Sequence, residues 1–140
     1  MKVTLMLADA AQAVGGKLYI LGGGWTNIYG AAPFAIAIKL EVPWSEASQT
    51  HDFRLELVDA DGHPVEVLQE DGSEQPIVIE GQISTGIAPG VKPGTPMDAV
   101  IAISVGALPL DVGRYAWRLT IDGQTEDDWR LAFNRADPPV

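Results

Sequence analysis

The 140-residue chain contains no cysteine. Disulfides, iron–sulfur clusters, cysteine-ligated zinc sites and thiol nucleophiles are therefore all excluded, and the composition fits a reducing compartment. A chain of this length buries roughly 70% of its unfolded surface, so it can fold without such cross-links. We expect one domain covering residues 1–140.

Basic clusters and long apolar runs are also missing. Nine Lys and Arg residues are scattered among nineteen Asp and Glu residues, which gives a formal net charge of −10 and disfavours nucleic acid as a partner. The apolar stretch Val3–Ala8 is too short for the core of a secretory signal, and Asp9 follows it. No run approaches the roughly 18 residues of a membrane span. We expect an acidic, cytoplasmic protein with no membrane span.

Long helical patterns are absent, and the apolar residues recur with a period of two. This alternation is typical of strands with one buried face. It predicts strands within the segments 3–7, 18–21, 34–41, 53–59, 65–68, 77–83, 99–105, 115–122 and 129–134. The regularly facing apolar residues predict a core of Leu5, Leu7, Phe34, Ile36, Ile38, Phe53, Leu55, Leu57, Ile101, Ile103, Trp117, Leu119, Leu131 and Phe133.

Turn residues separate the predicted strands. Asp-Gly pairs at 59–62 and 121–123 favour hairpin turns, and the Pro- and Gly-rich segment 86–96 indicates a loop that crosses between sheets. The segment 43–49 is the one place for a short helical turn. Together these features predict an antiparallel β-sandwich of about eight strands, immunoglobulin-like or jelly-roll-like. A small β-barrel is the alternative.

Three consecutive glycines, Gly22 to Gly24, pose the question of a phosphate-binding loop. A Walker loop needs a following lysine and hydroxyl, and a dinucleotide fingerprint needs a following helix. Here Trp25 and a predicted strand follow instead. We interpret the glycines as a bend or bulge in a sheet.

The segments "ADAAQ…GGKLYILGGGW", "PFAIAIKLEVP" and "HDFRLELVDADGHPV" resemble an uncharacterised bacterial family of unknown function. Members of that family begin A-D-x-A and continue G-K-L-x-I-L-G-G. The closing "GRYAWRLTIDG" is similar to a strand of immunoglobulin-like sandwiches. The resemblance implies a β-sandwich and no catalytic residues or cofactor.

Metal and catalytic candidates are few. Asp59 and Asp61 are weak metal candidates because their spacing partly imitates a calcium loop, although an EF-hand would need glycine where Pro64 stands. The histidines His51 and His63 have no metal-ligand spacing. Acidic residues cluster at 70–74 and 126–128, which fits solvated hairpin tips. A hydrolase using loop carboxylates, with or without a divalent ion, would need a cleft gathering at least two of Asp59, Asp61, Glu126, Asp127 and Asp128.

Aromatic residues supply the remaining candidates. Trp25 and Trp44 stand at a glycine bend and a turn, where they could close the ends of a sandwich or bind a sugar or a protein. With Tyr29 they form the candidate contact set for a small-molecule or carbohydrate binder. No catalytic motif is recognisable, so the leading hypothesis is a non-enzymatic protein that acts through protein–protein contact, as a homo-oligomer. The alanine face of Ala35 and Ala37 suits either a covering element of the chain itself or a partner.

Overall fold

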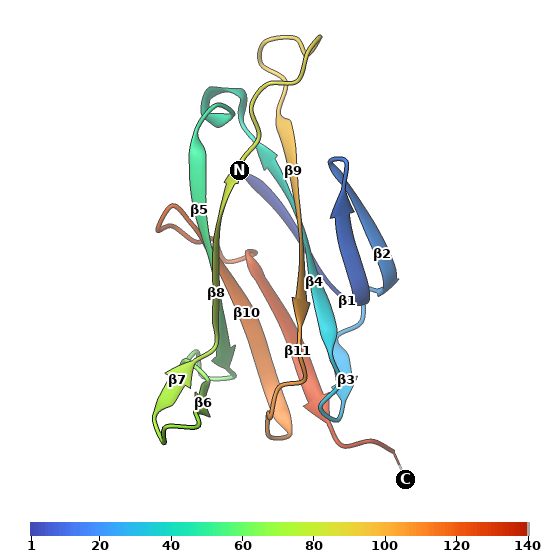
Figure 1. The fold of residues 1–140 in the computed structure, drawn as a ribbon, viewed down its shortest axis with the longest axis vertical. Helices are drawn as coiled ribbons and strands as arrows, with labels where there is room; N and C mark the ends of the chain where they lie inside the picture. The colour runs from blue at the N-terminus through green and yellow to red at the C-terminus, as the bar shows by residue number, and fades with distance from the viewer. Residues whose placement is uncertain (140) are drawn as a thin grey trace.

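The computed structural model describes residues 1–139 and is a β-sandwich of two facing sheets (Figure 1). The first sheet has the order β2-β1-β4-β9, and the second has the order β3-β11-β10-β5-β8. The strands of the first sheet are β1 (Lys2–Val14), β2 (Lys17–Gly23), β4 (Phe34–Val42) and β9 (Met97–Val105). Those of the second are β3 (Asn27–Tyr29), β5 (Thr50–Asp59), β8 (Val78–Ser84), β10 (Gly113–Ile121) and β11 (Arg130–Ala136). The short strands β6 (Glu66–Leu68) and β7 (Glu74–Pro76) form a separate ribbon.

The core lies between the two sheets. The inward residues of β4 and β5 alternate along each strand as the sequence predicts, and Trp117 of β10 is fully buried among them. Leu5, Ile101, Ile103 and Leu131 are only partly buried and pack against the edge of this core. The predicted sandwich is therefore confirmed. Ten of the fourteen predicted core residues are buried in the core, which also contains Leu40, Val42, Val105, Leu110, Ile121 and Trp129.

The strand number and the extent of β1 differ from the sequence prediction. Eleven strands are present in residues 1–139, because two strands of three residues each, β3 and β7, join the nine expected segments. The strand pairing within the second sheet is also not wholly antiparallel, since β3 pairs with β11 in parallel. Strand β1 was expected to end at Leu7 and instead continues to Val14. A bend after Ala8 lets its two halves pair with different neighbours.

The predicted turns are where the sequence places them. Gly22 and Gly24 have positive φ angles of 62° and 95°, so the triple glycine is a backbone bend at the end of β2. The segment 86–96 joins β8 of one sheet to β9 of the other. The three-residue 3-10 helix η1 (Trp44–Glu46) follows β4, and it is the only helix in the described chain. Residues 1–139 thus contain no helix long and apolar enough to cross a membrane.

The alanine face of β4 is covered by the chain itself. Ala35 and Ala37 are 2% and 1% exposed, although they point away from the core between the sheets. The outer half of β1 and strand β2 fold back over this face and contact β9, beyond β4. In Figure 1 this β1–β2 hairpin stands on the side of β4 and β9 that faces away from β5 and β8. It forms a partial third layer, so the alanine face is not a free surface for a partner.

Candidate functional site

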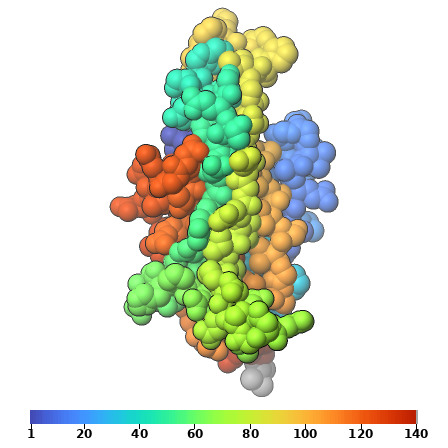
Figure 2. Space-filling model, turned by 60° about the vertical axis from the view of Figure 1, so that its left-hand side comes forward, coloured from blue at the N-terminus to red at the C-terminus, as the bar shows by residue number. Residues whose placement is uncertain are grey.

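The β1–β2 hairpin, defined here as residues 9–23, is built by a two-residue glycine turn. Val14 pairs with Lys17, and Gly15 and Gly16 between them have φ angles of 59° and 74°. Two successive positive φ angles are the signature of the tight turns that match strand twist. The hairpin projects from the side of the body in Figure 2, where its residues are blue. None of the strand residues of β2 belongs to the hydrophobic core or packs against it.

Large apolar side chains on this hairpin are exposed. Leu21 is 71% exposed, Tyr19 57% and Val14 56%, and these three share the face of the hairpin that also carries Ala10 and Gln12. On the other face, Ile20 lies close to Met6 of the first sheet, since both would touch a methyl group added at Gly23. One face of the hairpin thus contacts the first sheet near Met6, with Ile20 still 40% exposed, and the opposite face presents an apolar surface to solvent.

The outer edge of β2 has no hydrogen-bonded neighbour among residues 1–139. An exposed apolar edge strand is normally blunted by shortness, charge, proline or a bulge. The other edge strands show such features: β3 has three residues, β8 carries Glu80 and β9 carries Asp98. In β2 the only charged residue is Lys17 at its first position. This edge is therefore open to pairing with another strand.

The charge distribution sets the hairpin apart from the rest of the molecule. No acidic residue occurs between Asp9 and Glu41, while eighteen of the nineteen occur from Glu41 onward. With Asp9 and Lys17 as its only charged residues, the hairpin is a neutral region on a protein with a net charge of −10.

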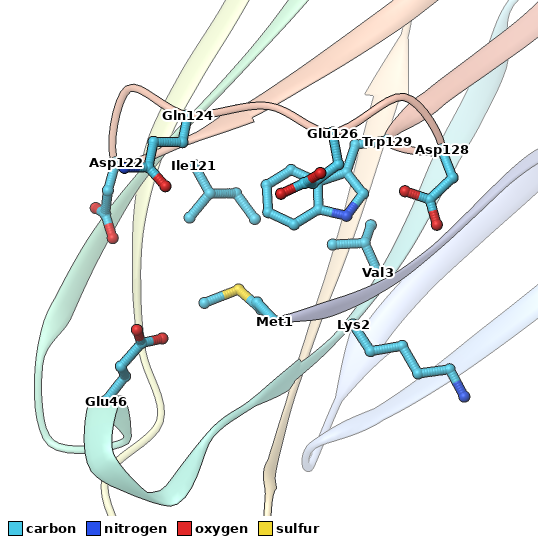
Figure 3. A pocket seen from close by; sticks show the side chains of 10 residues that line it. All are labelled: Met1, Lys2, Val3, Glu46, Ile121, Asp122, Gln124, Glu126, Asp128 and Trp129. Atoms are coloured by element: carbon cyan, nitrogen blue, oxygen red, sulfur yellow. The ribbon is translucent and has the colours of Figure 1, made fainter.

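A second feature is a cleft at the end of the sandwich where β1 begins and β10 ends. Its volume is about 570 Å³, and it is lined by the start of β1, by Glu46 of η1 and by the segment 121–129 that joins β10 to β11. Figure 3 shows Glu126 and Asp128 on one side of the cleft and Glu46 on the other. The cleft brings together two of the carboxylates that the hydrolase hypothesis named, Glu126 and Asp128.

His51 is 2% exposed and bonds to two residues that line this cleft, Asp122 and Glu46. Its Nδ1 is 2.6 Å from Oδ2 of Asp122, and its Nε2 is 2.9 Å from the carbonyl oxygen of Glu46. The hydrogen bond to Asp122 raises the pKa of His51 above 6.5 against the opposing effect of burial, and the same bond lowers the pKa of Asp122 below 3.8. The pair ties η1 to the turn after β10.

The predicted aromatic contact residues are not brought together. Trp25 packs edge-on against Phe34 at a ring-centroid distance of 6.0 Å, at the first residue of β4. Trp44 lies beyond the last residue of β4, in a hollow with Pro43 and Pro96. Tyr29 of β3 is 54% exposed. The two tryptophans are partly buried at opposite ends of one strand and do not share a binding surface.

The weak metal candidates form a turn. Asp59, Asp61 and His63 place one potential ligand atom each within 4.8 Å of one another. Asp59 Oδ1 already accepts hydrogen bonds from the backbone N–H groups of Asp61 and His63 at 2.9 and 3.0 Å. This arrangement is the Asx turn that an Asp-Gly hairpin needs, and the acidic groups are largely solvent-exposed. It lies at the opposite end of β5 from His51 and the cleft.

Sequence reasoning missed the exposed residues of the hairpin, Val14, Tyr19 and Leu21. A signal was present, because Gly15-Gly16 between two apolar stretches is a hairpin pattern. The sequence contains no comparable signal for the cleft, since the residues that line it come from three separate segments of the chain.

Comparisons with known proteins place the chain in a family. No curated protein matched it, and neither did any solved structure. A family model described as a family of unknown function, DUF6941, matches residues 3–134, which is nearly the whole chain. The chain therefore belongs to the DUF6941 family.

Proposed function

We propose that this protein is a non-enzymatic β-sandwich that acts through protein–protein contact, and that it self-associates through the outer edge of β2. The observation that carries the proposal is an unpaired edge strand with exposed apolar side chains, Tyr19 and Leu21, on an otherwise acidic protein.

The exposed face and edge of this hairpin are unfavourable in a monomer. An isolated two-stranded ribbon is at best marginally stable in water, and further strands or a packed face stabilise it. Here one face is seated near Met6, while Val14, Tyr19 and Leu21 remain in solvent. A third strand added at the β2 edge would satisfy the free backbone groups and cover part of this apolar surface.

Charge favours a second copy of this chain as the occupant. Two molecules that each carry −10 repel one another over most of their surfaces. The hairpin, whose only acidic residue is Asp9, is where they approach at the lowest electrostatic cost. A basic partner would instead be attracted to the acidic surfaces formed by residues from Glu41 onward.

Symmetry also suits this contact. Two identical strands that pair antiparallel are related by a two-fold axis, which gives a closed dimer with the same patch on both subunits. The regular part of β2 runs from Lys17 to Leu21, before the left-handed Gly22, and its centre is Tyr19. Pairing there would join the two four-stranded sheets into one continuous sheet.

Single-cysteine cross-linking tests this geometry without interference, because the natural chain has no cysteine. In an antiparallel pair centred on Tyr19, the two copies of residue 19 face each other with Cα atoms about 4.5–5.5 Å apart, which a disulfide can bridge. We expect Tyr19→Cys to give a covalent dimer on mild oxidation. Leu18→Cys and Ile20→Cys test the neighbouring registers.

The matched control is Ser104→Cys, an exposed position on β9, the opposite edge strand of the same sheet. We expect it to remain monomeric under the same oxidation. If none of the three β2 variants cross-links faster than Ser104→Cys, the β2 contact is wrong.

A further inference from the structure

The end cleft has the composition of a binding site, and it is separate from the proposed contact at β2. Its apolar floor includes Val3, Ile121 and Trp129. Its rim carries the carboxylates of Glu46, Glu126 and Asp128, which Figure 3 shows on opposite sides of the opening. A long side chain with an apolar stem and a charged head would match this combination.

The rim carboxylates have no cationic partner within residues 1–139. The lining lysine, Lys2, pairs with Glu41 at 3.6 Å, and Figure 3 shows it directed away from the cleft. The fourth lining carboxylate, Asp122, is already held by His51. Glu46, Glu126 and Asp128 therefore leave negative charge beside an apolar floor, which attracts a cation.

Trp129 supplies a hydrogen-bond donor to the wall of the cleft. Its side chain is more than nine-tenths buried, with the residue 8% exposed, and it is part of the cleft wall. In Figure 3 its ring lies between Glu126 and Asp128 with the indole nitrogen at the cleft. No residue of the described chain accepts a hydrogen bond from this N–H, and its nitrogen is not one of the buried unpartnered atoms, so it opens to solvent in the cleft. A carbonyl oxygen of a ligand in the cleft could replace solvent as the acceptor of this hydrogen bond.

We propose that the cleft binds a basic peptide segment of another protein. A lysine or arginine side chain lies along Val3, Ile121 and Trp129 and places its charge among Glu46, Glu126 and Asp128. A peptide carbonyl of the same segment accepts the hydrogen bond from Trp129 Nε1. The net charge of −10 increases the rate of encounter with such a segment at low salt.

The test uses an acetylated, amidated tetralysine peptide and the indole N–H resonances of the ¹⁵N-labelled protein. We expect the Trp129 N–H signal to move on titration, and the signals of Trp25, Trp44 and Trp117 to stay in place. The double variant Glu126→Gln, Asp128→Asn should weaken binding about tenfold, since two charge contacts of modest strength are lost.

The matched control is Glu66→Gln, Glu74→Gln, which removes the same charge from exposed positions on the β6–β7 ribbon. We expect less than a twofold effect. Equal weakening by both pairs would show attraction to net charge alone and overturn the proposal.

Spermine carries ammonium groups and no carbonyl. If it binds as tightly as the peptide and moves the Trp129 signal equally, the peptide assignment is wrong.

Discussion

His51 shows how one buried residue can make stability depend on pH. The carbonyl of Glu46 can only accept a hydrogen bond, and the ionised carboxylate of Asp122 can only accept one. An imidazole that satisfies both must carry a proton on each nitrogen. This explains why its pKa is raised even though the ring is 2% exposed.

We predict that the protein loses stability as pH rises through the pKa of folded His51. Because that pKa lies above 6.5, the stabilisation is fully present below 6.5 and disappears above the folded value. The loss should be about 1.5–3 kcal/mol, the range for a hydrogen bond to a charged group. Urea unfolding between about pH 6 and pH 9 measures it.

Asp122→Asn should flatten this profile while keeping a residue type that tolerates the φ of 51° at this position. At acid pH, stability should instead decrease as pH falls. The pKa of Asp122 is lowered from 3.8 in the folded protein, so its stabilising contribution is present above pH 3.8 and is lost as pH falls through the folded-state pKa. His63→Asn removes the other, exposed imidazole and serves as the control. An unchanged pH profile in Asp122→Asn would contradict the assigned role of the His51–Asp122 pair.

Strand β4 illustrates what alternation can predict. Phe34, Ile36 and Ile38 face the core as their period of two indicates, and the small residues between them form the opposite face. Alternation distinguishes the two faces of a strand, but it does not identify what covers each one. The cover over Ala35 and Ala37 comes from the second half of β1, whose alanine-rich sequence lacks a clear alternating pattern.

The covered alanine face predicts an overpacking effect. Ala37→Leu should lower the free energy of unfolding by about 1–3 kcal/mol, because the added atoms must displace the hairpin seated above. The control is Thr4→Leu, an exposed position on the same outer face beside Lys39. Urea unfolding measures both variants, and faster amide hydrogen exchange in β2 of Ala37→Leu would show the hairpin lifted. Equal stability of the two variants would mean that the face is not tightly covered.

At the scale of the whole molecule, the fold follows from the sequence more readily than the sites do. Alternating strands and Asp-Gly turns suffice to predict a β-sandwich or a small β-barrel, because each is a local signal. The cleft joins residues 1–3, Glu46 and 121–129, and this proximity depends on sheet order, which local patterns do not specify. The same limit explains why Trp25 and Trp44 could be chosen as candidates without showing that they lie at opposite ends of β4.

The most direct test of self-association through β2 is the molar mass in solution, measured by light scattering over about a hundredfold range of concentration. We predict that the natural chain approaches twice its monomer mass as concentration rises. Leu21→Lys with Tyr19→Lys should remain monomeric, because charge on an edge strand opposes pairing. Leu68→Lys, at another strongly exposed apolar residue, should behave as the natural chain does. A constant monomer mass for the natural chain at every concentration would contradict the account.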